Sequence, residues 1–132
     1  MRQPTTAAQA YAWHADALAG LEPTTTQDPQ CGWFKRRLVR GGPWVPARIW
    51  LFQEIDDATG ELVDDERLQA EVDGAFADPE DIWSYVCGNP ITEQEFRYLS
   101  ATTDWSRQHA PQEPMANPRQ AVDWTAVPTP TF

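Results

Sequence analysis

Two β-prone runs joined by a glycine-rich turn limit the fold of this chain more than any other feature of its sequence. Residues 31–40 and 44–54 are rich in aromatic and branched side chains, and Gly41-Gly42-Pro43 lies between them. Such runs around a short glycine-containing segment predict a β-hairpin. Pro46 has no backbone donor, so it requires a sheet edge or a ladder position that makes no hydrogen bond. We therefore expect an antiparallel sheet that begins with this hairpin.

The segment after the hairpin predicts one further strand. Asp57-Ala58-Thr59-Gly60 has the composition of a turn, and residues 67–72 read as a strand that ends at Asp73-Gly74. The sequence therefore predicts a small antiparallel β-meander of about three strands.

Helix signals flank the predicted meander. Residues 5–20 are rich in alanine, with Thr5 or Thr6 as a cap and Gly20 at the end. Two short helices are expected after the sheet, one opening at Asp78-Pro79 and one at the capping box Thr92-Glu93-Gln94-Glu95. The expected fold class is α+β. Residues 1–30 form an N-terminal helix and linker, residues 31–107 the α+β core domain, and residues 108–132 an extended Pro-rich tail.

Alternation sorts the hairpin side chains into two faces. If Val39 pairs with Trp44, then Lys35 lies opposite Arg48 and Trp33 opposite Trp50. The expected core face holds apolar side chains, namely Phe34, Leu38, Val45, Ala47, Ile49 and Leu51. The other face alternates cations with aromatic rings, namely Trp33, Lys35, Arg37, Trp44, Arg48, Trp50 and Phe52.

Charge is divided unevenly along the chain, whose net charge is −10. Residues 31–53 contain five cations and no acid, whereas residues 54–81 contain twelve acids and Arg67 as the one cation. The net charge disfavours passive binding to a nucleic-acid backbone, because that binding depends on clustered Lys and Arg. The hairpin face nevertheless carries clustered cations, so binding of nucleic acid through that face stays an alternative.

The hairpin face is the candidate binding site, formed by Trp33, Lys35, Arg37, Trp44, Arg48 and Trp50. Cations between broad rings can hold phosphates and stack bases of single-stranded nucleic acid. Lys35 opposite Arg48 would require an anion nearby, since like charges facing each other across a ladder are unfavourable. That anion is either a ligand or the acidic segment folding back, and Arg stacked on Trp is also a common structural pair.

Signals for catalysis and for metal binding are weak. The chain has no phosphate-binding glycine loop, nucleophile elbow or zinc-protease helix, and His14 and His109 stand without ligand-spaced partners. Cys31 and Cys87 have the spacing neither of a metal site nor of a disulfide framework, and we expect two partly buried free thiols. We predict no catalytic residues, no metal and no cofactor.

Three runs of the sequence carry a resemblance: Gly32 to Trp50, Trp83 to Tyr98, and Ala116 to Asp123. Over about residues 31–123 the chain resembles small uncharacterised proteins of bacteriophages and prophages. The resemblance implies no catalytic or binding residues. It implies a phage-encoded accessory protein in the bacterial cytoplasm that acts in DNA replication, recombination or evasion of host defence.

Three functions are compatible with these observations. The first is a non-enzymatic module that binds a host or phage protein through the hairpin face or through an acidic surface, whose candidate residues are Asp56, Asp57, Asp64, Asp65 and Glu66. The second is a single-stranded nucleic-acid binder, and the third is a structural or assembly component of the virion. No apolar run is long enough to span a membrane, and we expect a cytoplasmic protein with no membrane partner.

Overall fold

The computed structural model describes residues 3–21, 28–109 and 116, and its centre is an antiparallel sheet with strand order β1-β2-β3-β4. The strands are β1 (Gly32–Arg37), β2 (Trp44–Phe52), β3 (Arg67–Val72) and β4 (Ala75–Ala77). The helices are α1 (Ala7–Ala10), α2 (Ala12–Ala19), α3 (Pro79–Val86) and α4 (Glu93–His109). The α+β class and the antiparallel meander are therefore confirmed.

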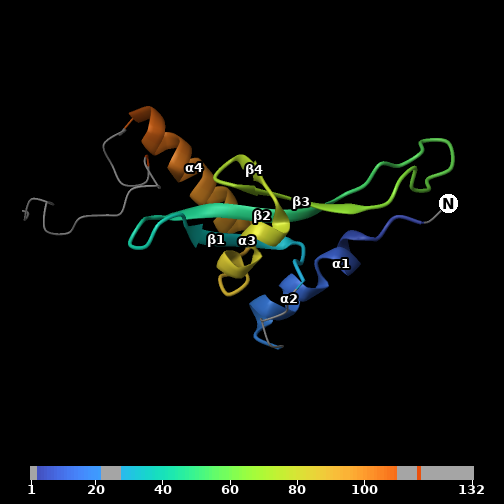
Figure 1. Cartoon of the computed structure of the whole chain (residues 1–132), viewed down its shortest axis with the longest axis horizontal. Helices are drawn as coiled ribbons and strands as arrows, with labels where there is room; N and C mark the ends of the chain where they lie inside the picture. The colour runs from blue at the N-terminus through green and yellow to red at the C-terminus, as the bar shows by residue number, and fades with distance from the viewer. Residues whose placement is uncertain (1–2, 22–27, 110–115, 117–132) are drawn as a thin grey trace, which may run out of the picture.

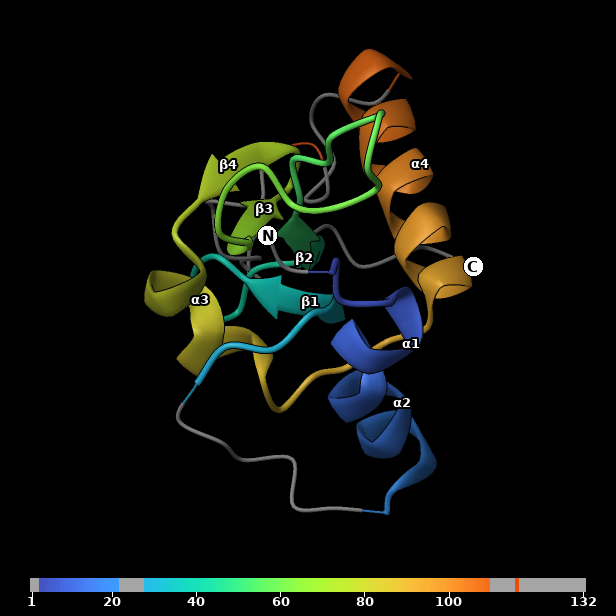
Figure 2. The same ribbon diagram turned by 90° about the vertical axis from the view of Figure 1, so that its right-hand side faces the viewer.

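The helices surround the sheet on three sides. In Figure 1 the strands run lengthwise, and the end-on view of Figure 2 shows α3 and α4 on opposite faces. The pair α1 and α2 lies beside β1. Among the described residues, no helix is long and apolar enough to cross a membrane. The predicted linker at 22–30 and tail at 108–132 lie largely outside the described residues, at 22–27, 110–115 and 117–132.

The hairpin register differs from the expected one by two residues. Trp33 faces Arg48, Lys35 faces Pro46 and Arg37 faces Trp44. The predicted pairs of Lys35 with Arg48 and of Trp33 with Trp50 are therefore wrong. The reason is the turn, which extends over residues 38–43 because the N–H of Gly42 donates to the carbonyl oxygen of Val39 and Gly41 has a φ of 77°. A slip of two residues leaves both faces unchanged, since side chains alternate with a period of two.

A fourth strand was missed by the sequence prediction. Asp73 and Gly74 do not simply end β3: with φ values of 55° and 82° they form a two-residue hairpin turn. The chain then returns as β4, pairing Val72 with Ala75 and Ala70 with Ala77. An Asp-Gly pair with left-handed backbone at both positions matches the twist of an antiparallel pair, which is why the reversal is so short.

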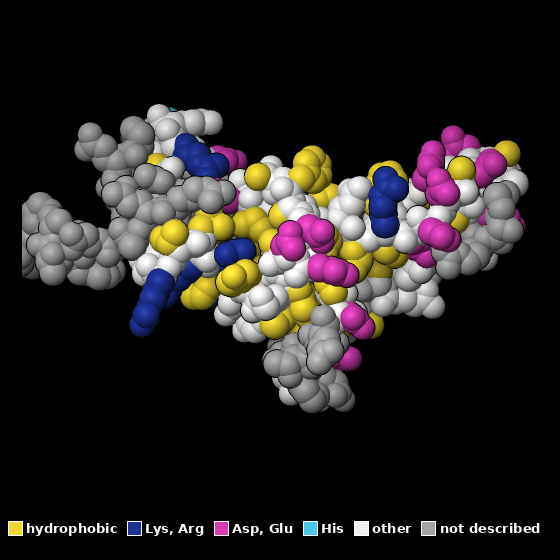
Figure 3. All heavy atoms as spheres, viewed as in Figure 1, with side chains coloured by type: hydrophobic (Ala, Val, Ile, Leu, Met, Phe, Trp, Pro, Cys, Tyr) yellow, Lys and Arg dark blue, Asp and Glu magenta, His cyan; other side chains and the backbone are white. Residues whose placement is uncertain are grey.

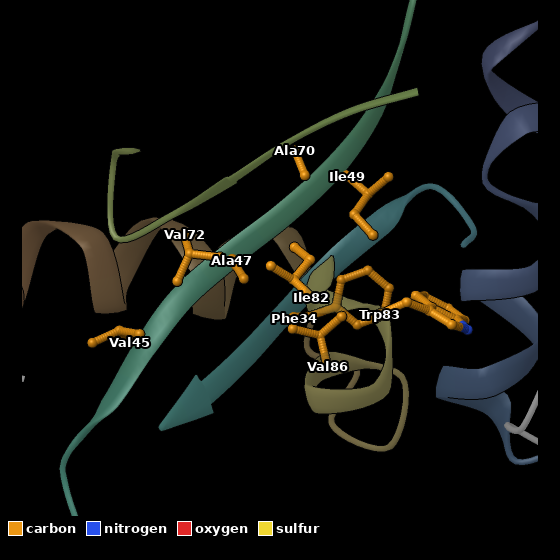
Figure 4. Close-up of a cluster of buried hydrophobic side chains, with 9 residues drawn as sticks. All are labelled: Phe34, Val45, Ala47, Ile49, Ala70, Val72, Ile82, Trp83 and Val86. Atoms are coloured by element: carbon orange, nitrogen blue, oxygen red, sulfur yellow. The ribbon is translucent and has the colours of Figure 1, made fainter. Parts of the chain in front are cut away.

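The core lies between the sheet and α3. The cluster in Figure 4 is fully apolar and consists of Phe34, Val45, Ala47, Ile49, Ala70, Val72, Ile82, Trp83 and Val86. Helix α3 begins as expected, with Asp78 accepting a hydrogen bond from the N–H of Glu80 and proline in its first turn. The expected core face of the hairpin is confirmed at Phe34, Val45, Ala47 and Ile49.

The predicted N-terminal helix is present but interrupted at Tyr11. Thr6 caps α1 through a capping box with Gln9, and Gly20 ends α2 in the left-handed conformation. Its buried residue is His14, whose role the sequence did not reveal. The Nε2 atom of His14 lies 3.0 Å from the carbonyl oxygen of Trp33 and 2.8 Å from that of Ile91. Because both partners are acceptors, Nε2 is the protonated nitrogen that donates to them.

Helix α4 is longer than expected and covers the other face of the sheet. It has 17 residues, and Thr92 caps it by accepting from the N–H of Glu95. Thr103 and Ser106, both buried, are small, so α4 can approach the sheet at buried Pro46. Arg107 forms an ion pair with Asp73, which ties the end of α4 to the β3–β4 turn. The expectation of two short helices was therefore wrong for the second.

Close packing of His14 on β1 predicts that Gly32 tolerates no side chain. A Cβ at Gly32 would lie 2.6 Å from Cδ2 of His14 and 2.9 Å from Cζ of Phe34. We expect Gly32→Ala to lower the free energy of unfolding by about 1–3 kcal/mol, the usual cost of overpacking. Urea unfolding followed by circular dichroism measures this. Gly88→Ala is the matched control, since nothing lies within 4 Å of its Cβ. Equal stability of the two variants would contradict the packing argument.

Candidate functional site

The hairpin face expected to bind a ligand exists, and it forms the second face of the sheet. We call it the aromatic–cation face and define it by Trp33, Lys35, Arg37, Trp44, Arg48 and Trp50. Alternation in β1 and β2 places these side chains opposite the core. The structure therefore brings all six predicted binding residues to one face.

Cations of this face rest on its own aromatic rings. Lys35 Nζ lies 4.6 Å and the Arg37 guanidinium carbon 4.5 Å from the centre of the Trp44 ring. The Arg48 guanidinium carbon lies 4.4 Å from the centre of the Trp50 ring. Such contacts stabilise by about 0.5–1 kcal/mol each at exposed sites. The interleaving that suggested a nucleic-acid surface is thus also an internal stacking arrangement.

Arg48 is neutralised within the sheet. It pairs across the ladder with Glu71 of β3, and its Nε donates to Glu71 Oε1 at 2.7 Å. The two side chains are 42% and 21% exposed, so this partly solvated pair contributes only about 0–1 kcal/mol. The pair shows that the acidic stretch 54–81 supplies the counter-ion of Arg48.

Tyr11, between α1 and α2, and the start of helix α4 cover parts of the aromatic–cation face. The Tyr11 ring stacks on Trp33 with centroids 4.8 Å apart, and burial, more than neighbouring Cys31, raises the pKa of the Tyr11 hydroxyl. Beside Trp44 and Lys35, the first turns of α4 leave a groove of about 650 Å³, lined also by Ile91, Thr92, Gln94, Glu95, Tyr98 and Leu99. Lys35 and Glu95 put opposite charges on this groove, so it has no net preference for an anion.

Residues 54–65 form a second candidate surface, which we call the acidic arm. It continues the β2–β3 hairpin, because Val63 N–H donates to Glu54 O and Asp56 N–H donates to Glu61 O, both at 2.8 Å. At its tip Asp56 Oδ1 accepts from the N–H of Ala58, and Gly60 has a φ of 71°. The predicted turn at 57–60 is therefore confirmed, and Figure 1 shows the arm extending beyond the rest of the sheet.

The five predicted acidic residues fall into two groups. Asp57, Asp64 and Asp65 are exposed and Asp56 is half-buried. Glu66 lies at the base of the arm, where its carboxylate accepts from the N–H and hydroxyl of Thr5 and from Nε2 of Gln53. Glu66 thus fastens the segment before α1 to the sheet and is a structural residue.

The uneven charge of the sequence becomes an uneven charge in space. Figure 3 shows Asp and Glu side chains gathered over the acidic arm at one end of the molecule, and Lys and Arg side chains projecting near the β1–β2 turn at the other. The acidic arm therefore lies at the opposite end of the sheet from the cations near the β1–β2 turn.

Three residues of these surfaces were missed by sequence reasoning: Tyr11, Glu71 and Phe76. Phe76 extends the aromatic–cation face on β4, with its ring 6.2 Å from that of Trp50. The period of the predicted strand 67–72 could have placed Glu71 on this face, whereas Phe76 lies on a strand that was not expected and that only the Asp-Gly turn could have indicated. For Tyr11 no local signal exists.

Ionisable side chains do not converge on one point in the part of the chain that the structure describes. No group of three or more His, Cys, Asp and Glu side chains there could hold a metal ion. Both cysteines are free, and burial raises the pKa of the Cys31 thiol to about 11. A thiol with so high a pKa is a poor nucleophile at neutral pH, because the thiolate is the reactive form.

Comparison with known proteins adds no relative: no family model, no curated protein and no solved structure matches the chain.

The two thiols should differ in reactivity. Cys31 is buried and its pKa lies about 11, above the ordinary value of 9.0, so its thiolate is scarce until the pH rises towards 11. Cys87 is partly exposed. At pH 8 we expect iodoacetamide to modify Cys87 at least about tenfold faster than Cys31, because Cys87 is accessible whereas Cys31 is buried and almost entirely in the unreactive thiol form. Peptide mass spectrometry measures the two rates.

Denatured protein is the control for this comparison. In urea both cysteines should react at similar rates, since unfolding removes the burial that raises the pKa of Cys31. Equal rates in the native protein would show that Cys31 is not held in the buried, neutral form.

Proposed function

We propose that this chain is a non-enzymatic binding module, a phage-encoded accessory protein of the bacterial cytoplasm that docks on a host or phage protein through its acidic arm. The resemblance to phage and prophage proteins supports the setting. The observation that carries the binding mode is the arm itself. It extends the β2–β3 hairpin beyond the sheet and exposes Asp57 and Asp64 beside half-exposed Ile55 and Val63.

An arm of this composition is suited to a basic groove. Carboxylates held on a narrow hairpin can take the places of phosphates in a groove that normally receives DNA, and a complementary potential accelerates the encounter. Ile55 bridges Leu62 across the arm, Val63 lies opposite Glu54, and Ile55 and Val63 are each about half exposed. They supply apolar contact, which phosphate alone would not offer. We infer a partner that handles DNA and has a cationic groove with an apolar wall.

The aromatic–cation face is less suited to this role. Arg48 already has Glu71 as its counter-ion, Lys35 and Arg37 rest on Trp44, and Tyr11 covers Trp33. A ligand phosphate would have to compete with these contacts. The acidic arm needs no such rearrangement, since Asp57 and Asp64 project into solvent.

Neutralising the arm tests the proposal. We expect the triple variant Asp56→Asn/Asp57→Asn/Asp64→Asn to lose about tenfold or more in affinity for a captured DNA-handling protein, because charge complementarity drives the encounter. The amide oxygen of an Asn at position 56 can still accept from the N–H of Ala58, so the turn is kept. The measurement is capture from a bacterial lysate on the immobilised full chain, followed by titration of the purified partner at two salt concentrations.

A second variant removes the same charge elsewhere. Glu80→Gln/Asp81→Asn/Asp104→Asn changes three exposed carboxylates on α3 and α4 and should leave binding unchanged. DNA added to the wild-type complex should release the partner, since both would occupy the same groove. Equal binding by the two triple variants, or a complex that DNA does not disturb, would refute the arm as the docking element.

Single-stranded nucleic acid is tested directly by a gel shift. We expect no shift of a labelled oligonucleotide by the wild-type protein at micromolar concentration, since its net charge is −10 and the cations of the aromatic–cation face already contact Trp44, Trp50 or Glu71. A shift that disappears in Trp44→Ala/Arg48→Ala/Trp50→Ala would instead favour the nucleic-acid alternative. Glu71→Gln, which releases Arg48, would then be expected to strengthen it.

A further inference from the structure

The two edges of the sheet differ in how they are protected. Along β1, Lys35 N–H donates to the carbonyl oxygen of Asn89, and Ile91 N–H donates to that of Trp33. Phe34 and Pro90 form an isolated bridge at the same edge, and α2 lies beside it. The chain therefore covers the β1 edge itself. Unprotected edges are rarer in monomeric proteins because they pair with other chains.

The β4 edge has no such cover in the part of the chain that the structure describes. Its sequence is Ala75-Phe76-Ala77, which contains neither a charge nor a proline that would discourage pairing. In a two-residue hairpin the residues that flank the turn bond to each other, so Ala75 and Ala77 bond to β3. Phe76 alternates with them and directs its N–H and C=O outward. Within the described residues, no backbone group outside β3 pairs with these two atoms.

Apolar surface flanks this edge on both faces of the sheet. Phe76 is 81% exposed, the highest value among the large apolar side chains of the described residues, and its ring centre lies 6.2 Å from that of Trp50. On the core face, a hollow of about 430 Å³ lies against β4, and its lining combines apolar Leu38, Val72 and Ile82 with charged Arg36 and Asp73. An exposed aromatic ring at an open edge indicates a surface that is covered in use.

We propose that a second copy of this chain pairs with β4, forming a two-fold symmetric dimer with one continuous eight-stranded sheet. The edge is self-complementary. An antiparallel approach with Phe76 opposite its own copy gives a pair that exchanges both N–H to C=O bonds, and the neighbouring alanines cause no clash. The two Phe76 rings then lie on the same face, against each other and against the two Trp50 rings.

Charge selects the antiparallel orientation. Each chain carries −10, so two copies repel unless their acidic parts stay apart. The two-fold reverses the second copy, which places the acidic arms at opposite ends of the dimer, well beyond a Debye length of about 8–10 Å. A parallel approach would put the arms side by side. At the contact itself, Arg48 and Glu71 form a neutral pair and β4 is uncharged.

Analytical ultracentrifugation of the full chain tests this. We expect the wild type to approach twice its mass of 14.9 kDa at concentrations of about 100 μM, since a small interface binds in the micromolar range. Phe76→Lys, which keeps the backbone donor but adds a charge, should sediment as a monomer. Phe76→Pro should do the same, because it removes the outward N–H while Ala75 and Ala77 still bond to β3.

Tyr98→Lys is the matched control. Tyr98 is 73% exposed on α4, away from the edge, so the same loss of an aromatic ring should leave the dimer intact. Circular dichroism shows whether each variant folds. If Phe76→Pro does not fold, the mass of Phe76→Lys alone tests the proposal. A monomeric wild type, or a dimer that persists in Phe76→Lys, would overturn the proposal. If the wild type is a monomer that captures another protein from a lysate, and the Phe76 variants no longer capture it, the dimer proposal fails and the β4 edge binds that other protein. The triple variant of the acidic arm should remain dimeric. A failure of the dimer proposal can therefore be told apart from a failure of the proposed docking through the arm.

Discussion

The burial of Phe34 is the contact on which the structure depends. Its side chain is fully inaccessible and meets three rings from two helices: Trp13 and His14 of α2 and Trp83 of α3. One residue of β1 therefore joins both helical layers to the core face of the sheet. The same packing explains the buried donor at His14, which holds the carbonyl oxygens of Trp33 and Ile91, and the need for glycine at position 32, where the imidazole leaves no room. In so small a domain, a few large aromatic side chains supply much of the buried area.

The other face of the sheet shows how polar and cationic residues are accommodated where a helix covers only part of it. Helix α4 approaches through small side chains over Pro46, and the remaining cations use aromatic rings or Glu71 as partners. This face is therefore satisfied by the chain itself. The groups that are left for other molecules lie at the margins of the sheet: the carboxylates of the acidic arm at one end, and the β4 edge with Phe76 along one side. Both surfaces offer contact without breaking an existing pair.

Much of the fold could be predicted because it follows local rules. Strand β3 coincides with the predicted residues 67–72, Thr92 caps α4, and the two faces of the hairpin were sorted correctly by alternation. The register was wrong, since the turn absorbed Leu38 and Val39, and only its hydrogen bond from Gly42 reveals that. Strand β4 was missed because three residues are too few to show a period. The six residues of the candidate site were found together, whereas their partners Tyr11 and Glu71 were not, because both come from distant parts of the chain.

By itself, the sequence determined the α+β class, the sidedness of the hairpin and the separation of charge along the chain, because periodicity and composition are properties of neighbouring residues. Only the tertiary structure decided which of those charges remain free. All the carboxylates of the acidic stretch look alike in the sequence, but their surroundings differ. Glu66 accepts hydrogen bonds from Thr5 and Gln53, and Glu71 pairs with Arg48. Asp57 and Asp64 are exposed to solvent. The difference arises because a counter-ion is chosen by proximity in space, and strand pairing brings residues 23 positions apart, such as Arg48 and Glu71, to 2.7 Å.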